Sequence, residues 1–179
     1  MRGGYHAGCL QAILGVVRVV NPAVVPIDLN NPEHAASLLF LLDHYARDPM
    51  GGGAGLSEHT KETLIARLRE IPHFYGAMAF ADGHAVGLIH CFFGFSTFAA
   101  EPLLNTHDIV VHADYRNPGV GQALLAHAEA VAKETGCCKL TLEVLSNNLA
   151  ALKTYQRAGF APYVLGPKAG SALFLQKKI

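Results

Sequence analysis

An apolar run, a glycine-containing turn and a helical pattern follow one another directly between residues 109 and 135. The run is Ile-Val-Val at 109–111, and the turn is Arg-Asn-Pro-Gly-Val-Gly at 116–121. Apolar residues then recur at helical spacing, which predicts a strand, a tight turn and the start of a helix. Backbone N–H groups at such a turn point outward, and the helix dipole adds partial positive charge. The turn therefore suits a diphosphate.

This turn differs from the two common nucleotide-binding loops. No Gly-Lys-Ser/Thr follows it, as a P-loop requires, and its glycine spacing is not that of the dinucleotide fingerprint. Gly119 and Gly121 would let phosphate groups approach the backbone closely. Pro118 has no N–H to donate, so it must occupy a position whose amide is not needed. Taken alone, the turn also fits an ordinary helix N-terminus.

A second segment, residues 147–160, contains the pattern Asn-x-x-Ala-x-x-x-Tyr-x-x-x-Gly-Phe. Together with the Arg-x-x-Gly-x-Gly turn, in the same order and at a similar separation, it resembles the GNAT superfamily of N-acetyltransferases. The resemblance covers residues 22–179 and is strongest over 105–160. It implies an α/β fold, the GNAT fold, with a mixed central sheet of six to seven strands and helices on both faces. Residues 1–21 are then an N-terminal extension.

Hydrophobic periodicity predicts the same order of elements. Strands are expected at 24–29, 74–81, 85–93, 105–113, 140–144, 160–165 and 172–176. Helices are expected from 32 to 45, from 58 to before Pro72, over 120–135 and over 148–158. Asn31 and Ser57 are expected N-caps of the first two helices, and Asp82-Gly83 indicates a hairpin.

Composition limits the classes of partner. Formal net charge is zero and no basic tract is present, so no nucleic-acid partner is expected. The apolar stretch 9–20 is too short to span a bilayer, so we expect no membrane partner, and we interpret the chain as cytoplasmic. The N-terminal extension suggests a contact within a homodimer. Neither the four cysteines, interpreted as free thiols, nor the ten histidines show a metal-ligand spacing, so no metal is expected.

The resemblance implies acetyl-CoA as a co-substrate and transfer of its acetyl group to a primary amine of a small molecule, by direct attack on the thioester. Acetylation of a protein or peptide amine, and non-catalytic acyl-CoA sensing, are the alternatives. The residues implied to bind the co-substrate are Ile109, Val110, Val111, Arg116, Asn117, Gly119, Val120, Gly121, Gln122, Asn148, Ala151 and Tyr155. Among them, the amide of Val111 is the candidate for polarising the thioester carbonyl.

Two residues are expected to move protons. By resemblance, the Tyr155 hydroxyl would protonate the departing CoA thiolate. His107 is the candidate general base, because alternation along a strand would put it on one face with Ile109 and Val111. Glu143 is the reserve base. The region around His107-Asp108 is similar to the diamine and polyamine acetyltransferase branch, which commonly has Glu-Asp at these two positions.

Overall fold

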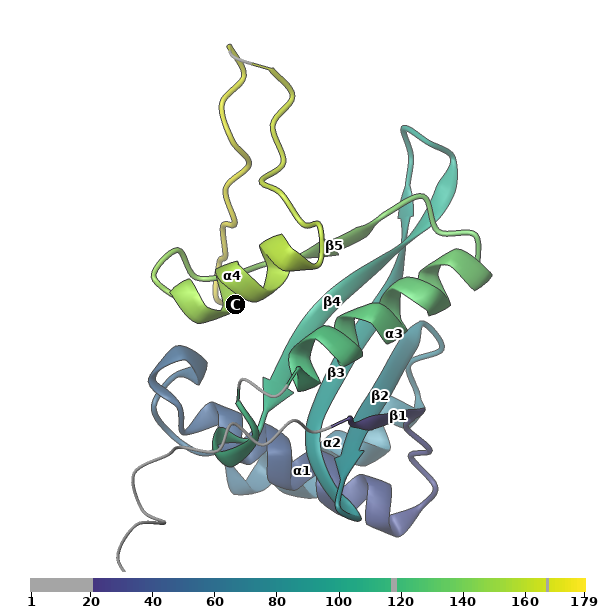
Figure 1. The fold of residues 1–179 in the computed structure, drawn as a ribbon, viewed down its shortest axis with the longest axis vertical. Coiled ribbons are helices and arrows are strands. Elements are labelled where there is room, and N and C mark those ends of the chain that lie inside the picture. The colour runs from purple at the N-terminus through teal and green to yellow at the C-terminus, as the bar shows by residue number, and fades with distance from the viewer. Residues whose placement is uncertain (1–20, 117–118, 167) are drawn as a thin grey trace, which may run out of the picture.

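The structure is a computed structural model that describes residues 21–116, 119–166 and 168–179. A single mixed sheet runs through its centre (Figure 1), with five strands in the order β1-β2-β3-β4-β5. The strands are Ala23–Pro26, Phe74–Ala81, His84–Ser96, Glu101–Val111 and Leu140–Leu142. Neighbouring strands from β1 to β4 pair antiparallel, whereas β5 pairs parallel to β4.

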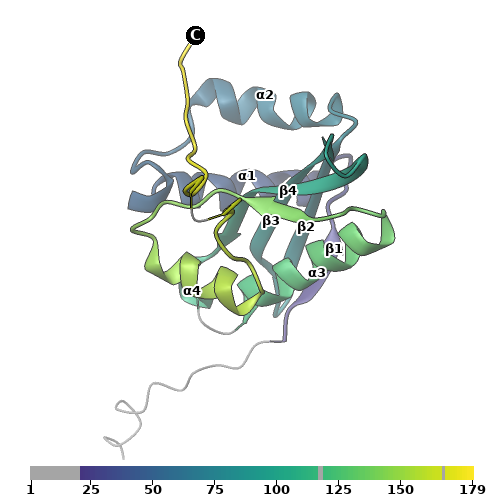
Figure 2. The same cartoon turned by 90° about the horizontal axis from the view of Figure 1, so that it is seen from above.

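Helices cover both faces of this sheet, as the sequence predicts. Figure 2 shows α1 (Pro32–Ala46) and α2 (Glu58–Arg69) on one face, with α3 (Val120–Glu134) and α4 (Leu149–Arg157) on the other. The core on the α1–α2 face consists of Leu38, Leu41, Leu68, Met78, Leu88 and Val110. The core on the α3–α4 face includes Ile89, Leu104, Leu124, Leu125, Ala128 and Tyr155. Two short 3-10 turns, Pro49–Gly51 and Ala113–Tyr115, lie in the connections.

Polar side chains start the helices at the expected residues. The Asn31 side chain accepts hydrogen bonds from the backbone N–H groups of Glu33 and His34, which satisfies donors that have no partner within α1. Ser57 caps α2 in the same way. The hairpin between β2 and β3 turns at Asp82 and Gly83, which have φ values of 51° and 79°. Both angles are positive, as a type I′ turn requires.

The expectation of six to seven strands is wrong, because the chain after α4 does not join the sheet. In the described part of residues 160–179, the pairing found is a single bridge between Val164 and Ser171. Figure 1 shows this segment rising away from the sheet and then returning toward α4. Leu165 and Leu173 remain 76% and 82% exposed, so burial does not hold the segment against a sheet face. β5, at this side of the sheet, is only 3 residues long.

A bulge in β4 changes which side chains share a face. His90 pairs with Asp108 and Cys91 pairs with Thr106, so His107 is an extra residue with no partner in β3. The expectation that His107 shares a face with Ile109 and Val111 is therefore wrong. Those two side chains pack toward α3, whereas the exposed His107 ring meets Phe92, which packs against the α1–α2 core. Regular alternation cannot anticipate an inserted residue.

The N-terminal extension, residues 1–21, lies outside the described residues apart from its last position. Among the helices that the structure describes, none combines the length and the apolar character needed to cross a membrane.

The start of α3 is expected to pack closely against the sheet only because Gly87 has no side chain. A Cβ at this position would lie 2.8 Å from the Val110 carbonyl oxygen and 2.9 Å from a Val120 methyl group. Since one of these neighbours is backbone, Gly87→Ala should lower the free energy of unfolding by about 1–3 kcal/mol. Gly166→Ala is the matched control, because a Cβ there meets nothing within 4 Å. Urea unfolding measures both, and equal stability of the two variants would contradict this packing.

Candidate functional site

The sheet opens between β4 and β5. Pairing of these strands runs from Leu104↔Leu140 to Thr106↔Leu142, where β5 ends, while β4 continues to Val111. The His112 N–H donates to the Val86 carbonyl at 2.8 Å. Because direction alternates along an antiparallel ladder, the amides of Val111 and Ile109 point away from β3, toward the opening. No other described strand pairs with this part of β4 on that side.

Side chains of this stretch of β4 divide between the two faces. Ile109 and Val111 pack against the α3 core. Val110 is 2% exposed and packs in the α1–α2 core, and alternation turns its amide toward β3. Of the three apolar residues expected to bind the co-substrate, Ile109 and Val111 therefore present their backbone to the opening, and Val110 does not.

The N-terminus of α3 lies beside this opening. Gly119 is the N-cap residue, with a φ of 93°, and no side chain among the described residues caps the helix. A Cβ on Gly119 would meet nothing within 4 Å, so the space beside this residue is open. A Cβ on Gly121 would lie 3.5 Å from a Thr154 methyl group and 3.8 Å from a Val111 methyl group. The turn, the end of β4 and α4 thus converge at one place.

Two of the predicted binding side chains make contacts within the protein. Arg116 Nη2 lies 2.7 Å from Asp48 Oδ2 in the connection after α1. The backbone N–H of Met50 and the Arg116 guanidinium hold the pKa of Asp48 below its ordinary value. Gln122 Nε2 donates to the Thr154 carbonyl at 2.7 Å, which ties α3 to α4. Val120 is buried, and Asn117 and Pro118 lie outside the described residues.

The motif residues of α4 lie on the side of the sheet that α3 covers (Figure 2). Asn148 caps the helix, and its Oδ1 accepts from the Ala151 N–H at 3.2 Å. Tyr155 is 8% exposed and meets the Phe160 ring edge-on. Burial raises the pKa of Tyr155 to about 12, and the charges of Tyr45 and Asp108 add to this rise. The phenol therefore keeps its proton throughout the neutral range.

Polar groups gather on the α1–α2 side of the bulge. His107 is exposed, with its ring edge-on to Phe92 at a centroid distance of 5.5 Å. The Asp108 carboxylate reaches a buried histidine, with Oδ2 3.4 Å from His90 Nδ1. Burial, followed by the charge of Asp108, raises the pKa of Tyr45. Sequence reasoning missed His90 and Tyr45 as site residues, because only the strand register and the position of α1 bring them to Asp108.

Glu143 lies past the end of β5, on the exposed side of the chain. Its Oε1 accepts from Asn105 Nδ2 at 3.4 Å, and the same amide donates to Thr141 Oγ1 at 3.0 Å. This reserve base thus joins the two strands at the closed end of the opening. Within the described residues, no group of three His, Cys, Asp or Glu side chains is placed to hold a metal ion.

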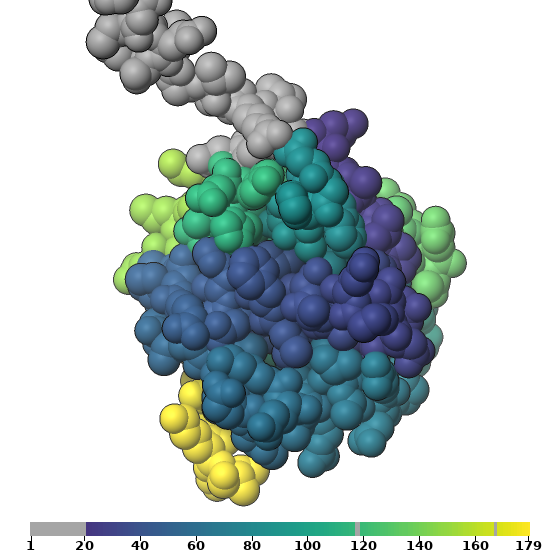
Figure 3. Space-filling view, turned by 90° about the horizontal axis from the view of Figure 1, so that it is seen from below, coloured from purple at the N-terminus to yellow at the C-terminus, as the bar shows by residue number. Residues whose placement is uncertain are grey.

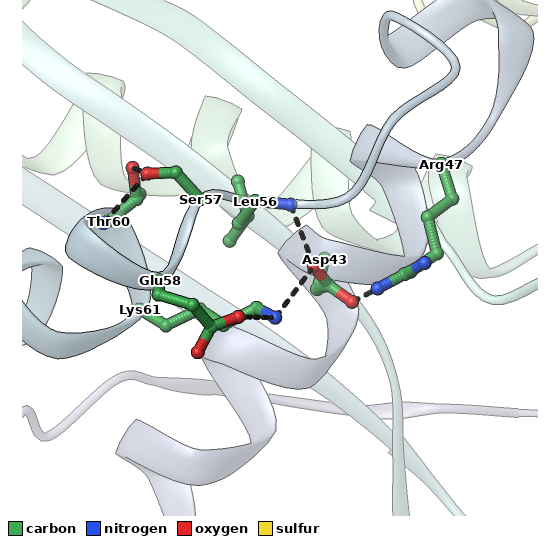
Figure 4. A network of polar contacts seen from close by, with 7 residues as sticks. All are labelled: Asp43, Arg47, Leu56, Ser57, Glu58, Thr60 and Lys61. Atoms are coloured by element: carbon green, nitrogen blue, oxygen red, sulfur yellow. Dashed lines mark hydrogen bonds and ion pairs between the residues drawn. The ribbon is translucent and has the colours of Figure 1, made fainter.

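A polar network fixes the connection between α1 and α2. Asp43 Oδ1 accepts from the Leu56 N–H at 2.8 Å, and Oδ2 accepts from Arg47 Nε at 2.9 Å. Lys61 of α2 lies 3.8 Å from the same carboxylate (Figure 4). The connection carries Asp48, and through Asp48 it holds Arg116 near the turn before α3. Figure 3 shows that α1 and α2 occupy the centre of this face of the molecule.

Comparison with known proteins identifies the family of the chain. Residues 38–160 match the model of the acetyltransferase (GNAT) family. A streptothricin acetyltransferase from Streptomyces lavendulae is 38% identical over 81 residues, which are 45% of this chain and 41% of that enzyme. The chain therefore spans less than half of the length of this relative.

Solved structures share the fold at lower identity. A probable acetyltransferase superposes with a TM-score of 0.72 at 23% identity, over 87% of this chain and 99% of that one. An aminoglycoside N-acetyltransferase in complex with CoA gives a TM-score of 0.67 at 18% identity, over 92% of this chain and 99% of that enzyme. An aminoglycoside acetyltransferase from an uncultured soil metagenomic sample, in complex with sisomicin, gives a TM-score of 0.68 at 14% identity, over 88% of this chain and 95% of that enzyme.

We predict that Asp43→Ala loosens the connection between α1 and α2. The Leu56 N–H loses its acceptor, so its amide should exchange with solvent faster, as hydrogen–deuterium exchange would show. Glu62→Ala removes an exposed carboxylate of α2 and should leave Leu56 unchanged. The hydrogen bond of Arg47, followed by that of Leu56, lowers the pKa of Asp43. Protection of Leu56 should thus persist above the ordinary aspartate pKa and disappear only as pH falls through the lowered value. Equal exchange in both variants would contradict this role.

Proposed function

The chain belongs to the acetyltransferase (GNAT) family, and on this premise we propose that it transfers the acetyl group of acetyl-CoA to a primary amine of a small molecule. The observation that carries the proposal is the convergence of three features: the uncapped N-terminus of α3, the open edge of β4 and Tyr155. The 38% identity to part of a streptothricin acetyltransferase supports a small-molecule acceptor.

The residues present fit acetyl-CoA at the turn before α3. A diphosphate needs several N–H donors without a competing side-chain cap, together with space over them. At the start of α3 no described side chain caps the first N–H groups, and a Cβ on Gly119 would meet nothing within 4 Å, which supports both requirements. Arg116 would not need to bind the phosphates itself, since its guanidinium pairs with Asp48. Its contribution would be to hold the turn.

The proposed reaction is a direct transfer between two substrates. The amine nitrogen attacks the thioester carbonyl carbon, an N–C bond forms, the C–S bond breaks, and one proton passes from the amine side to the sulfur side. The Val111 N–H, pointing into the opening, would stabilise the negative charge that develops on the carbonyl oxygen. Tyr155 would give its proton to the CoA sulfur, and its raised pKa ensures that the proton is present.

The acceptor amine would approach from the α1–α2 side of the bulge. Three carboxylates could meet a cationic amine: Asp48, Glu101 and Asp108. Asp48 is paired with Arg116, Glu101 begins β4 at the end away from the opening, and Asp108 lies at the bulge itself. Asp108 would thus contact the ammonium, and the exposed His107 would collect its proton, directly or through a water. Glu143 is the next candidate base, although its carboxylate is bonded to Asn105.

The test of this function is release of free thiol from acetyl-CoA across a panel of amines. The panel contains streptothricin, aminoglycosides, diamines and polyamines, amino acids and peptides with free amines. We expect turnover with at least one small-molecule amine. Turnover with peptides alone would replace this proposal by protein or peptide acetylation, and acetyl-CoA binding without any turnover would indicate a sensor.

Gly121→Glu is expected to abolish acetyl-CoA binding, because it directs a negative charge toward the proposed diphosphate site. A Cβ at Gly121 makes only ordinary contacts, so the fold should tolerate the change. Gly121→Gln is the matched control with the same size and no charge, and it should bind more tightly than Gly121→Glu. Binding is measured as the rise in melting temperature with acetyl-CoA. Normal binding by Gly121→Glu would contradict the assignment of the turn.

Tyr155→Phe is expected to lower turnover by roughly 10² while leaving acetyl-CoA affinity unchanged, since it removes only the proton that the thiolate receives. The substitution preserves the ring that packs against Phe160. Single-turnover kinetics separates chemistry from product release. If turnover is unchanged when chemistry limits the rate, Tyr155 contributes only to packing of the core and not to catalysis.

His107→Gln should also lower kcat by roughly 10², because glutamine cannot accept the amine proton. The side chain is exposed, so acetyl-CoA affinity and stability should remain close to those of the wild type. Steady-state kinetics with the best amine of the panel measures the effect. An unchanged kcat would exclude His107 as the base and make Glu143 the next residue to test.

A further inference from the structure

His90 is a buried polar side chain whose only hydrogen-bond partner in the described structure is Asp108. It lies in β3, on the face covered by α1 and α2, and its side chain is 4% exposed. Its Nδ1 is 3.4 Å from Asp108 Oδ2, at the long end of the hydrogen-bond range. Phe74 meets the ring nearly edge-on at a centroid distance of 5.4 Å. Its Nε2 is fully buried and has no partner among the described residues.

These surroundings favour one form of the imidazole. With the proton on Nδ1, the ring donates to the carboxylate, and only a bare acceptor nitrogen remains unpaired in the core. A proton on Nε2 alone would direct the Nδ1 lone pair at a carboxylate and bury an unpaired N–H donor. A proton on Nδ1 is therefore the expected arrangement.

Asp108 uses only one of its oxygens in this contact. No hydrogen-bond partner of Oδ1 is found in the part of the chain that the structure describes, and the side chain is 27% exposed. Its charge acts on Tyr45 and on Tyr155. One oxygen of the carboxylate thus meets the core through His90, and the other has no partner among the described residues.

We propose that His90 is a positioning residue, which fixes the Asp108 carboxylate through Oδ2 so that Oδ1 meets the ammonium group of the acceptor. This inference rests on the proposed function and deepens it, because a carboxylate held in one orientation selects cationic amines over neutral acceptors. The bulge at His107 is what makes the arrangement possible, since it sets Asp108 opposite His90 in the ladder. His90 itself would touch neither substrate.

Two variants of similar size separate positioning from packing. His90→Leu fills the apolar core but donates no hydrogen bond, whereas His90→Asn retains an N–H near the position of Nδ1. With streptothricin, or the best amine of the panel, as acceptor, His90→Leu should raise the KM for the amine roughly tenfold, the scale of a lost hydrogen bond to a charged group. The KM for acetyl-CoA should not change, and His90→Asn should recover most of the loss. Equal effects of both variants, or a parallel rise in both KM values, would overturn the positioning role.

A second measurement does not depend on activity. Long-range ¹H–¹⁵N NMR spectra of the full chain at neutral pH report which imidazole nitrogen carries the proton. We expect His90 to be protonated at Nδ1 in the wild type and to lose this preference in Asp108→Ala. Protonation at Nε2 in the wild type would overturn the inference whatever the kinetics show. Absence of turnover by the wild type would instead contradict the proposed function, while the NMR spectra still report on the His90–Asp108 contact.

Discussion

The candidate site depends on the position at which β5 ends, after only three residues. β4 continues beyond it, so backbone amides that would otherwise pair within the sheet face an opening. An unpaired strand edge inside a protein needs a partner, because a buried N–H without an acceptor is costly. An extended substrate arm beside β4 would meet that need. The uncapped N-terminus of α3 lies at one end of the opening, and α4 with Tyr155 borders it.

Local chemistry made much of the fold predictable. Asn31 and Ser57 satisfy the first N–H groups of their helices, and Asp82-Gly83 reverses the chain with two positive φ angles. The two closing strands were not predictable in the same way. Residues 160–165 and 172–176 have the composition of strands, but composition does not specify which surface a strand covers. Here Phe160 packs against Tyr155, while Leu165 and Leu173 remain exposed.

The site shows a similar division. The Gly-containing turn and the segment around Tyr155 are continuous in sequence, so a motif can locate both. The bulge at His107 is a property of the ladder between β3 and β4, and it reverses the face on which the histidine lies. His90 and Tyr45 belong to distant elements that only the assembled sheet brings to Asp108. Sequence therefore identifies the proposed co-substrate side more completely than the proposed acceptor side.

The central claim is that acetyl-CoA lies along the open edge of β4 with its diphosphate on the first turn of α3. The most direct test is a ¹H–¹⁵N NMR titration of the full chain with acetyl-CoA. The claim predicts that the largest amide shifts occur at Ile109, Val111, Gly119, Val120 and Gly121. Saturable binding that leaves these amides unmoved, with the shifts concentrated instead in the separate pocket lined by Ile27, Leu68 and Phe74, would contradict it.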